Sequence, residues 1–518
     1  YIFDLHSTKN ASKLLRARSF ELQALSENIS DSLLERFQLP HFCRIINAGG
    51  KFTVLLPNIP QVQDELQKFR KELDHYFIQK YHGQITFNLS EGVEACGRDF
   101  DQSKSISLFR SISLDSARAK QKKLQTVLMS QADHVLDKDY DKIQETAGIC
   151  DQCRERPGFH EIDETLFCHS CKDLFQFGGE LPKAKFMRIS QNKTKNALNL
   201  FDGKILEVLR EKTSSEDSLV SLHNYHSGLA LKHSSSYIPS EGNKILTMEE
   251  IGARSTGMDH IAMFKADLDN LGGIFSIGMK EKTSLSRYSS MSRMLNYFFS
   301  DYLHHMIEKS EKYKDIYIVF SGGDDLCLIG PWNIVIDFAA EFQKEFERFV
   351  GKNPNLTISG GIALASNKLP VKSLAQMTEE LLDKSKDKDM KNSITLFGKT
   401  ISWIRLRELL KESDKLMTQV FRNQKNSKEG LSKGLVYRLL NYSKKAQAMT
   451  DGDFRGDIPL WKSHLSYDIS RNVYEEELRK ELLSQLTKEE VINDMPVAVS
   501  HVLYQLRDRK NGGHKNED

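Results

Sequence analysis

Between residues 251 and 400, short apolar runs of strand length alternate with stretches whose apolar residues recur every three or four positions, as on one face of a helix. This pattern predicts strands at Ile261–Ala266, Ile316–Phe320, Leu326–Gly330, Leu356–Leu364 and Ile394–Phe397, and helices at Arg287–Lys309, through Phe338–Phe346, and at Ser373–Lys386. The core order is strand, helix, strand, strand, helix, strand. That order is typical of the split βαβ, or ferredoxin-like, arrangement.

The first 90 residues repeat the same order. We expect strands at Tyr1–Leu5, Phe42–Ala48, Thr53–Leu56 and Gln84–Leu89, with helices at Ala11–Phe37 and Val62–Tyr81. Both copies carry a Gly-Gly pair in the hairpin between the two central strands, Gly49-Gly50 in the first copy and Gly322-Gly323 in the second. The sequence therefore predicts an α+β protein with two ferredoxin-like domains.

The segments between and after the two copies differ from them. Ser103–Leu136 is a polar helical stretch, and Ser214–Lys244 is rich in Ser, His and Gly, which predicts a loop. Beyond residue 400 the pattern is helical, at Leu406–Leu410, Leu435–Leu440, Val473–Leu486 and Val497–Leu506. We expect a small helical bundle there, followed by a disordered polar tail, Asp508–Asp518.

The composition, 39% hydrophobic and 28% charged over 518 residues, is that of a soluble globular protein of several domains. No run of about 18 apolar residues predicts a membrane span. The net charge of +2 excludes a global field for nucleic acid, so an RNA surface would have to be local. Lys411–Lys445 is a basic candidate, and a solvated helix face explains it equally well. The chain begins at Tyr1 without a Met or a secretory signal, which suggests that an N-terminal part is missing.

Four of the seven cysteines form two CxxC pairs, Cys150/Cys153 and Cys168/Cys171, with fourteen residues between the pairs. Two such knuckles fit a tetrahedral four-thiolate Zn²⁺ site, and a filled shell of protein ligands makes that zinc structural. The remaining cysteines are scattered, which argues against a disulfide framework and for a cytoplasmic protein.

Acidic residues follow the second copy's strands where its fold would bring them together. With strand order 4-1-3-2, Asp267 at the end of the first strand adjoins Asp324 and Asp325 in the hairpin between the second and third. Clustered carboxylates need a cation, and hard oxygen ligands suit Mg²⁺ or Mn²⁺, with Asp269 as a further candidate ligand. Two such metals serve phosphoryl transfer. Alternatively, Gly-Gly-Asp-Asp is an ordinary turn.

Nucleotide contacts are expected around the same hairpin. Gly322 and Gly323, with Ser321 before them, allow close approach of a nucleotide to the backbone. The turn through Asn270, Gly272 and Gly273 exposes N–H groups where a triphosphate could bind. Lys391, just before the last strand, is placed to reach phosphate, or else is a solvated turn lysine.

Several motifs together resemble one known family. Lys265–Gly272, Ser286-Arg287, Ser292-Arg293 and Phe320–Asp325 look like the second palm domain of the large signature subunit of type III CRISPR effector complexes. Arg18-Ser19-Phe20, Gly49–Phe52, the cysteine pairs and the helical C-terminus look like the same subunit. The resemblance covers essentially the whole chain and is closer to the Csm-type, type III-A, subunit than to the Cmr-type.

The resemblance implies a function. Target RNA pairs with the guide RNA and activates synthesis of cyclic oligoadenylates from ATP, second messengers in antiviral defence. The 3′-hydroxyl of one ATP attacks the α-phosphate of the next, and pyrophosphate leaves. The expected domains are a non-catalytic palm (1–100), a helical, zinc-binding linker domain (101–250), a catalytic GGDD palm (251–400) and a helical domain (401–518). The implied partners are the other type III-A subunits, guide RNA and target RNA.

The chain departs from the family pattern in places. It has no His-Asp dipeptide, so we expect the family's DNA-cleaving HD domain to be absent. Met390 replaces the Gly that usually precedes the Lys-Asn pair at Lys391. In the first copy, Lys51-Phe52 stand where two acids would be, so this copy should not catalyse. Gly49, Gly50 and Lys51 could hold one of two ATP molecules, or this palm is a purely structural partner.

Two other functions compete with this interpretation. One is a catalytically silent scaffold that binds guide RNA and partner subunits, against which the intact Asp267, Asp324 and Asp325 argue. The other is a GGDEF-type dinucleotide cyclase that uses GTP, against which the second palm, the cysteine pairs and the helical C-terminus argue.

Overall fold

A computed structural model of the chain describes residues 1–6, 10–48, 50–101, 104–135, 148–191, 196–211, 219–222, 232–234, 237–242, 244–274, 284–387 and 391–507. Its contacts divide it into two compact units, each built from separate stretches of sequence. Unit 1 comprises Tyr1–Thr247, Asn270–Leu328 and Lys368–Ala375, and unit 2 comprises Met248–Asp269, Ile329–Asn367 and Gln376–Asp518. None of the helices described is both long enough and apolar enough to cross a membrane.

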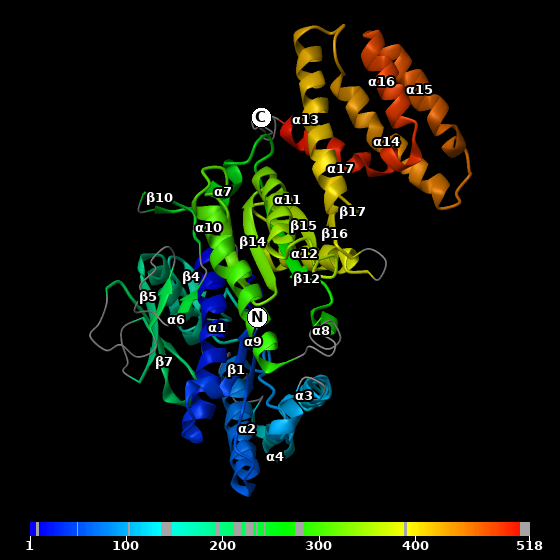
Figure 1. Cartoon of the computed structure of the whole chain (residues 1–518). Helices are drawn as coiled ribbons and strands as arrows, with labels where there is room; N and C mark the ends of the chain where they lie inside the picture. Colours follow the sequence, from blue (N-terminus) through cyan, green and yellow to red (C-terminus); the bar gives the residue numbers. More distant parts are fainter. Residues whose placement is uncertain are drawn as a thin grey trace. The chain divides into compact units, whose positions relative to one another are not determined.

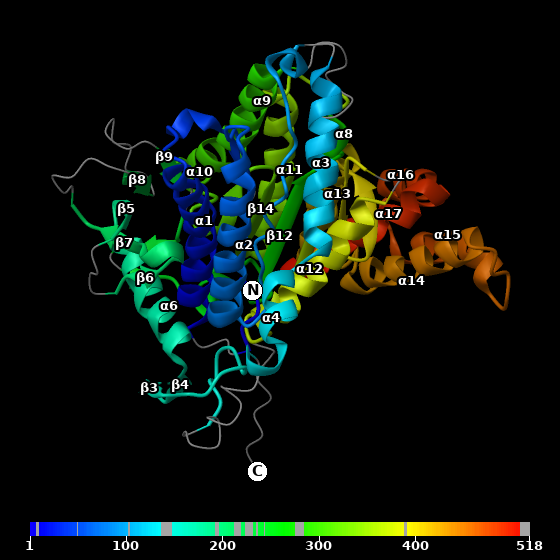
Figure 2. The same ribbon diagram turned by 90° about the horizontal axis from the view of Figure 1, so that it is seen from below.

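In unit 1, the first copy consists of helices α1 (Ala11–Arg36) and α2 (Pro60–Tyr81) and a hairpin of β1 (Arg44–Ala48) and β2 (Lys51–Val54). The two helices lie side by side (Figure 2), joined by the ion pairs Glu21–Lys80 and Arg36–Glu72, each 2.7 Å long. Gly50 in the hairpin turn has a φ of 69°, a conformation that favours glycine. Gly49 lies outside the described residues.

Two strands predicted for the first copy are wrong. Tyr1–Leu5 forms a turn instead, because the Arg18 guanidinium donates to the carbonyl oxygens of Tyr1 (2.6 Å) and Asp4 (2.9 Å). Gln84–Leu89 is irregular, and Arg70 donates to the carbonyl oxygens of Leu89 and Ser90. In both segments a side chain from a helix takes backbone acceptors that a neighbouring strand would otherwise use.

The middle of the chain adds helices α3 (Ser105–Gln121) and α4 (Gln125–Val135), and a cysteine-bearing part with the hairpin β3 (His160–Ile162) and β4 (Thr165–Phe167) before α6 (His169–Glu180). The predicted loop Ser214–Lys244 is wrong in part. Its described residues include β8 (Leu219–Leu222), which pairs with β5 (Phe186–Ser190), and β9 (Lys232–Ser234). Pairing with a neighbouring strand decided this structure, and local sequence does not reveal such a neighbour.

The second copy forms a six-stranded sheet in the order β13-β14-β12-β15-β16-β17. The strands are β12 (His260–Leu268), β13 (Tyr317–Gly322), β14 (Asp325–Pro331), β15 (Ile358–Ser366), β16 (Ser393–Leu396) and β17 (Lys399–Ser402). The first four keep the predicted order, with β12 between β14 and β15. In unit 2, β12 and β15 are antiparallel with Asp267 opposite Ser359, and β16 runs parallel to β15. The hairpin partner β17 was not predicted.

The helices of the second copy are α9 (Leu285–Tyr297), the π-helical segment η7 (Phe298–Tyr302), α10 (Leu303–Glu308), α11 (Trp332–Phe349) and α12 (Val371–Ser385). The predicted helical C-terminus is confirmed by α13 (Trp403–Lys425), α14 (Lys433–Thr450), α15 (Trp461–Asn472), α16 (Glu476–Leu486) and α17 (Glu489–Gln505). These five helices form one group (Figure 1), in which α17 packs against α13 and α14. The fold is thus a mixture of helical and sheet domains.

A close contact between α1 and α6 gives the first testable prediction. A Cβ added at Gly178 would lie 2.0 Å from the carbonyl oxygen of Lys13, whereas one added at Gly179 would meet nothing within 4 Å. Gly178→Ala should therefore lower the free energy of unfolding by about 1–3 kcal/mol, through overpacking against backbone. Gly179→Ala should raise it by about 0.5–1 kcal/mol, because alanine favours helix. Denaturant unfolding of the two variants measures both changes in the free energy of unfolding. Equal stabilities of the two variants would contradict the close contact.

Candidate active site and metal centre

The turn between β13 and β14 presents the two hairpin acids. Gly323, the first turn residue, has a φ of 70°, and Asp324 follows it before β14 begins at Asp325. The Gly323 N–H donates to Oδ1 of Asn296, at 3.0 Å. Both acids are partly exposed. The positive φ at Gly323 explains why glycine occupies this position, and the hydrogen bond fixes the turn from the side.

Asn296 lies near the end of α9, immediately before the π-helical segment η7. The Ser321 hydroxyl donates to the carbonyl oxygen of Phe299, at the start of η7. Two groups at the junction of α9 and η7 therefore hold the hairpin, one on each side of Gly322. Sequence reasoning missed Asn296, because a single asparagine in a helical stretch gives no local signal; π-helical turns are often found at functional sites.

Two cavities flank the hairpin inside unit 1. The first, of about 180 Å³, contains Asp324, and the second, of about 350 Å³, contains Asp325. Predicted nucleotide-binding residues line them: Lys51, Gly272 and Gly323 in the first, and Gly50, Ser321, Gly322 and Gly323 in the second. Each cavity thus joins one hairpin carboxylate to residues of the first copy's β1–β2 hairpin, Asp324 to Ile46 and Lys51, and Asp325 to Asn47 and Gly50.

Two predicted nucleotide-binding residues of the turn at 270–273 are not brought to either cavity. Asn270 has a φ of 56° and precedes the short helix α8 (Leu271–Gly273). Neither Asn270 nor Gly273 lines either cavity, and Gly49 lies outside the described residues. Of the turn at 270–273, only Leu271 and Gly272 face the cavity that contains Asp324.

The first cavity brings an acid and a base together. Burial raises the pKa of the Asp324 carboxyl above its usual value. Desolvation, and then repulsion from Lys120, lower the pKa of the Lys51 ammonium. Both charged forms are thus less well solvated than in water. A ligand that brings a cation to Asp324 and an anion to Lys51 would offset the desolvation free energy of each charged group.

Helix α9 connects the first copy to this hairpin. The Ser289 hydroxyl donates to the carbonyl oxygen of Ile45 in β1, at 3.2 Å. The rings of Tyr288 and Phe109 stack with centroids 4.5 Å apart and planes 5° from parallel, and both line the cavity that contains Asp324. The first copy, α3 and the hairpin are therefore held to the same helix.

Unit 2 contains the other two predicted acids, in different environments. Asp269 is 2% exposed; its Oδ1 accepts from Ser359, and its Oδ2 from Thr357 and from the backbone N–H of Asn392, at 2.8 to 3.0 Å. Both oxygens are thus occupied by neutral donors. Asp269 anchors the segment before β16, and this environment favours a structural role over metal binding.

Asp267 is 26% exposed at the end of β12 and forms an ion pair with Lys386. Burial, and then repulsion from the exposed Lys391, lower the pKa of Lys386, so the two lysines lie near each other. Sequence reasoning missed Lys386, which follows the last turn of α12. Asp267 belongs to unit 2 while Asp324 and Asp325 belong to unit 1, so the predicted meeting of all three at one metal pair stays a prediction.

The four clustered cysteines form the second site. Cys150, Cys153, Cys168 and Cys171 are all buried, and their Sγ atoms lie within 4.8 Å of one another. Zn–S bonds of about 2.3 Å in a tetrahedron place the sulfurs about 3.8 Å apart, close to the 4.0 Å between Cys153 and Cys168. The Cys171 N–H donates to Cys168 Sγ at the start of α6, which favours a thiolate there. The donor set fits a structural zinc ion.

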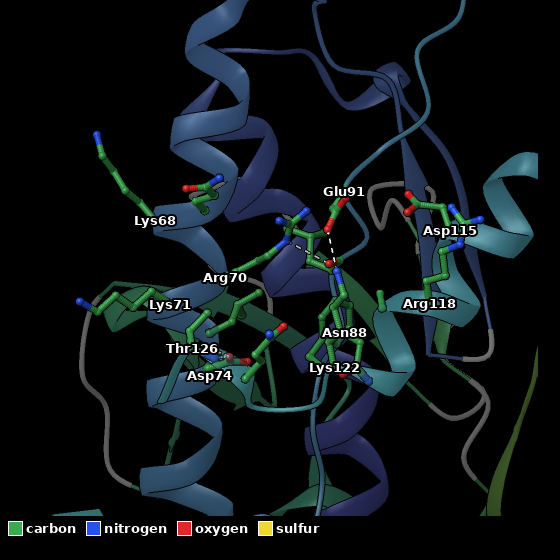
Figure 3. A pocket seen from close by; sticks show the side chains of 16 residues that line it. Lys68, Arg70, Lys71, Asp74, Asn88, Glu91, Asp115, Arg118, Lys122 and Thr126 are labelled. Carbon is green, nitrogen blue, oxygen red and sulfur yellow. Dashed lines mark hydrogen bonds and ion pairs between the residues drawn. The ribbon is translucent and has the colours of Figure 1, made fainter. Parts of the chain in front are cut away.

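A third cavity, of about 470 Å³, lies between α2, α3 and α4 (Figure 3) and contains none of the predicted site residues. Its acids are engaged locally: Asp74 accepts from the Thr126 N–H and hydroxyl, and Glu91 forms an ion pair with Lys122. The first contact joins α4 to α2, and the second joins the segment after Leu89 to the residue that follows α3, so both acids have structural partners.

Comparisons with known proteins show which sequences and folds this chain resembles. A sequence profile for the second palm domain of Cas10/Cmr2 matches residues 260–395, and one for domain B of the Csm1 subunit matches residues 1–137. A curated protein of Enterococcus italicus, named CRISPR system single-strand-specific deoxyribonuclease Cas10/Csm1 (subtype III-A), is 26% identical over 98% of this chain and 65% of its own length. One of the same name from Methanocaldococcus jannaschii is 26% identical over 78% of this chain and 58% of its own length. The chain thus spans less than two thirds of the length of these relatives.

Solved structures share the fold. A Csm1–Csm4 subcomplex of the type III-A CRISPR-Csm interference complex matches with a TM-score of 0.72 and 21% identity, over 96% of this chain and 67% of that one. A Csm1–Csm4 cassette in complex with AMPPNP matches with a TM-score of 0.69 and 21% identity, over the same shares of the two chains. At such identities the likeness establishes the fold.

The cysteine cluster predicts a zinc requirement. Cys150→Ser should reduce bound zinc from about one ion per chain to near zero and lower the melting temperature, because structural zinc contributes folding free energy. Metal analysis of the purified chain measures this. Cys96→Ser is the matched control, since Cys96 is exposed and outside the cluster. Full zinc occupancy in Cys150→Ser would contradict the assignment.

The hydrogen bond from Gly323 predicts a local effect at the hairpin. Asn296→Ala leaves the partly buried Gly323 N–H without its acceptor, a loss of about 1–3 kcal/mol. Hydrogen exchange of the peptide around 320–326 should therefore speed up by about tenfold or more. Met294→Ala, at a residue of the same helix that is 58% exposed, should leave that exchange unchanged. Equal exchange in the two variants would show that Asn296 does not hold the turn.

Proposed function

Because this chain belongs to the Cas10/Csm1 family of type III-A CRISPR large subunits, we propose that it is a metal-dependent nucleotidyltransferase that joins ATP molecules into cyclic oligoadenylates. One observation carries the proposal. Two cavities flank the Gly-Gly-Asp-Asp hairpin, and each contains one of its carboxylates together with residues of the first copy's β1–β2 hairpin. A reaction between two nucleotides needs two such places beside one set of acids.

The residues have separate roles in the proposed reaction. Asp267, Asp324 and Asp325 would hold two Mg²⁺ or Mn²⁺ ions, which supply charge neutralisation and a more acidic 3′-hydroxyl when bound. Lys51 would pair with a phosphate in the cavity that contains Asp324. The glycines at 50, 272, 322 and 323 would let phosphate and ribose approach the backbone closely. Asn296 and Ser321 would keep the hairpin in place.

The bond changes follow from the substrates. The 3′-oxygen of one ATP attacks the α-phosphorus of the other, the bond from that phosphorus to the β-phosphate bridging oxygen breaks, and pyrophosphate leaves. The hydroxyl proton passes to solvent. Repetition lengthens the chain. Attack by its own terminal 3′-hydroxyl on the α-phosphorus of its 5′-triphosphate then closes the ring, with loss of a further pyrophosphate and a proton to solvent. The first copy, which has Lys51-Phe52 in place of acids, would bind substrate without catalysing.

The relatives support ATP as the substrate. Similar solved structures are described as Csm1–Csm4 cassettes in complex with AMPPNP, pppApA and cA4. We propose that this chain likewise works beside a Csm4-type subunit, with guide RNA and activating target RNA, in the cytoplasm. We also retain the domain division at residues 100, 250 and 400 as a proposal. The deoxyribonuclease in the relatives' name describes longer proteins, and we assign none of that activity to the residues described.

The proposal is tested with the full chain, alone and assembled with its partner subunits, guide RNA and target RNA. Labelled ATP and Mn²⁺ or Mg²⁺ should give cyclic oligoadenylates. Asp324→Asn and Asp325→Asn should each reduce the rate by about 100-fold or more, the scale of removing one preorganised electrostatic group. Asp414→Asn, at an exposed residue of α13, should have no effect.

Three outcomes would contradict parts of the proposal. Absence of oligoadenylates under every condition would contradict the polymerase function and favour the scaffold. Faster turnover of GTP than of ATP would favour a dinucleotide cyclase. Unchanged product formation by Asp324→Asn and Asp325→Asn would contradict the site.

A further inference from the structure

Two ion pairs of opposite polarity connect β12 to α12 in unit 2. Lys265 of the strand pairs with Glu379 of the helix, and Asp267 pairs with Lys386 just beyond the helix. Lys265 and Asp267 are two positions apart, so they lie on the same face of the strand. Only the second pair includes an acid that the proposed reaction uses. The first pair therefore serves as a control, because breaking it removes an ion pair between the same elements without changing Asp267.

The neighbouring acid shows what Asp267 lacks. Asp269 is fully buried, and its two oxygens accept three hydrogen bonds from neutral donors. For Asp267, the described contact is a lysine ammonium, whose side chain is 28% exposed. The charge of Asp269 is thus balanced by fixed dipoles, whereas that of Asp267 is balanced by a cation on a flexible four-carbon stem.

We propose that Lys386 is an internal counter-ion that competes with a divalent cation for Asp267. This inference rests on the proposed function, which assigns Asp267 to metal binding. In the nucleotide-free chain, Lys386 satisfies the carboxylate and weakens its affinity for a free metal ion. A divalent cation and an ammonium on the same carboxylate repel each other, so metal binding displaces Lys386.

The displaced ammonium has a consequence for substrate binding. Lys391 already lies close enough to Lys386 to repel it. Released from Asp267, Lys386 would lose its counter-charge while it still faces Lys391, and an anionic ligand would relieve that repulsion. A metal ion that arrives with a nucleotide triphosphate therefore displaces Lys386 more readily than a free ion does. The lysine would make metal binding at Asp267 depend on nucleotide.

The test measures Mn²⁺ binding to the zinc-loaded full chain without nucleotide, by electron paramagnetic resonance of free Mn²⁺. Lys386→Met should bind Mn²⁺ about three- to tenfold more tightly than the natural chain, the scale of removing one partly exposed ion pair. Lys386→Gln, which keeps a polar group, should act in the same direction. Lys265→Met, which breaks the other ion pair, should leave the affinity unchanged.

Further variants test whether the gain in Mn²⁺ affinity depends on Asp267 and on nucleotide. Adding Asp267→Asn to Lys386→Met should abolish the gain. In the natural chain, a non-hydrolysable ATP analogue should tighten Mn²⁺ binding more than it does in Lys386→Met. Melting temperatures confirm that each variant is folded before its affinity is compared.

Either of two results would overturn the inference. One is an affinity in both Lys386 variants no higher than in the natural chain; the other is a gain that persists with Asp267→Asn. The readout does not depend on catalysis. A chain that makes no oligoadenylate but gains Mn²⁺ affinity in Lys386→Met would contradict the proposed reaction and support the counter-ion.

Discussion

A carboxylate removed from water needs a compensating partner, and the acids of the second copy depend on this requirement in different ways. Asp269 is compensated by three neutral donors, and Asp267 by the ammonium of Lys386. At Asp324, burial raises the pKa of the carboxyl. These differences separate acids that look equivalent in the sequence. Asp269 has a complete set of partners inside the fold, whereas Asp267 is paired with one ammonium and the Asp324 carboxyl is partly desolvated.

The hairpin that presents Asp324 and Asp325 is held by groups distant in sequence. Asn296 accepts from Gly323, and the carbonyl oxygen of Phe299 accepts from Ser321. The same helix, α9, contacts the first copy through Ser289 and α3 through Tyr288. Because the hairpin and the first copy both contact α9 directly, a change in the position of α9 would alter the positions of both.

The two copies differ in the residues that follow their Gly-Gly pairs. The second copy follows its glycines with two acids, and the first follows them with Lys51-Phe52. An acidic turn suits metal ions, and a basic one suits phosphate. The two turns line the same cavities in unit 1, so an unequal pair makes a site that two identical turns would not make.

The sequence by itself determined the alternation of elements, the strand order of the second copy, the two CxxC pairs and the hairpin acids. These depend on periodicity, on turn chemistry and on spacing, which are local properties. Two of its errors share one cause. Tyr1–Leu5 and Gln84–Leu89 have the composition of strands, but Arg18 and Arg70 take backbone acceptors there. Such partners come from other elements, and periodicity does not show them.

The tertiary structure alone decided which acids have fixed partners and which groups hold the hairpin. Asp267 and Asp269 are two residues apart and identical in type. The donors of Asp269 come from β15 and the segment before β16, and the counter-ion of Asp267 comes from just beyond α12. Asn296 likewise acquires its role only when α9 packs beside the hairpin. In each case, the physical reason is a contact between residues tens of positions apart, which only the folded chain brings together.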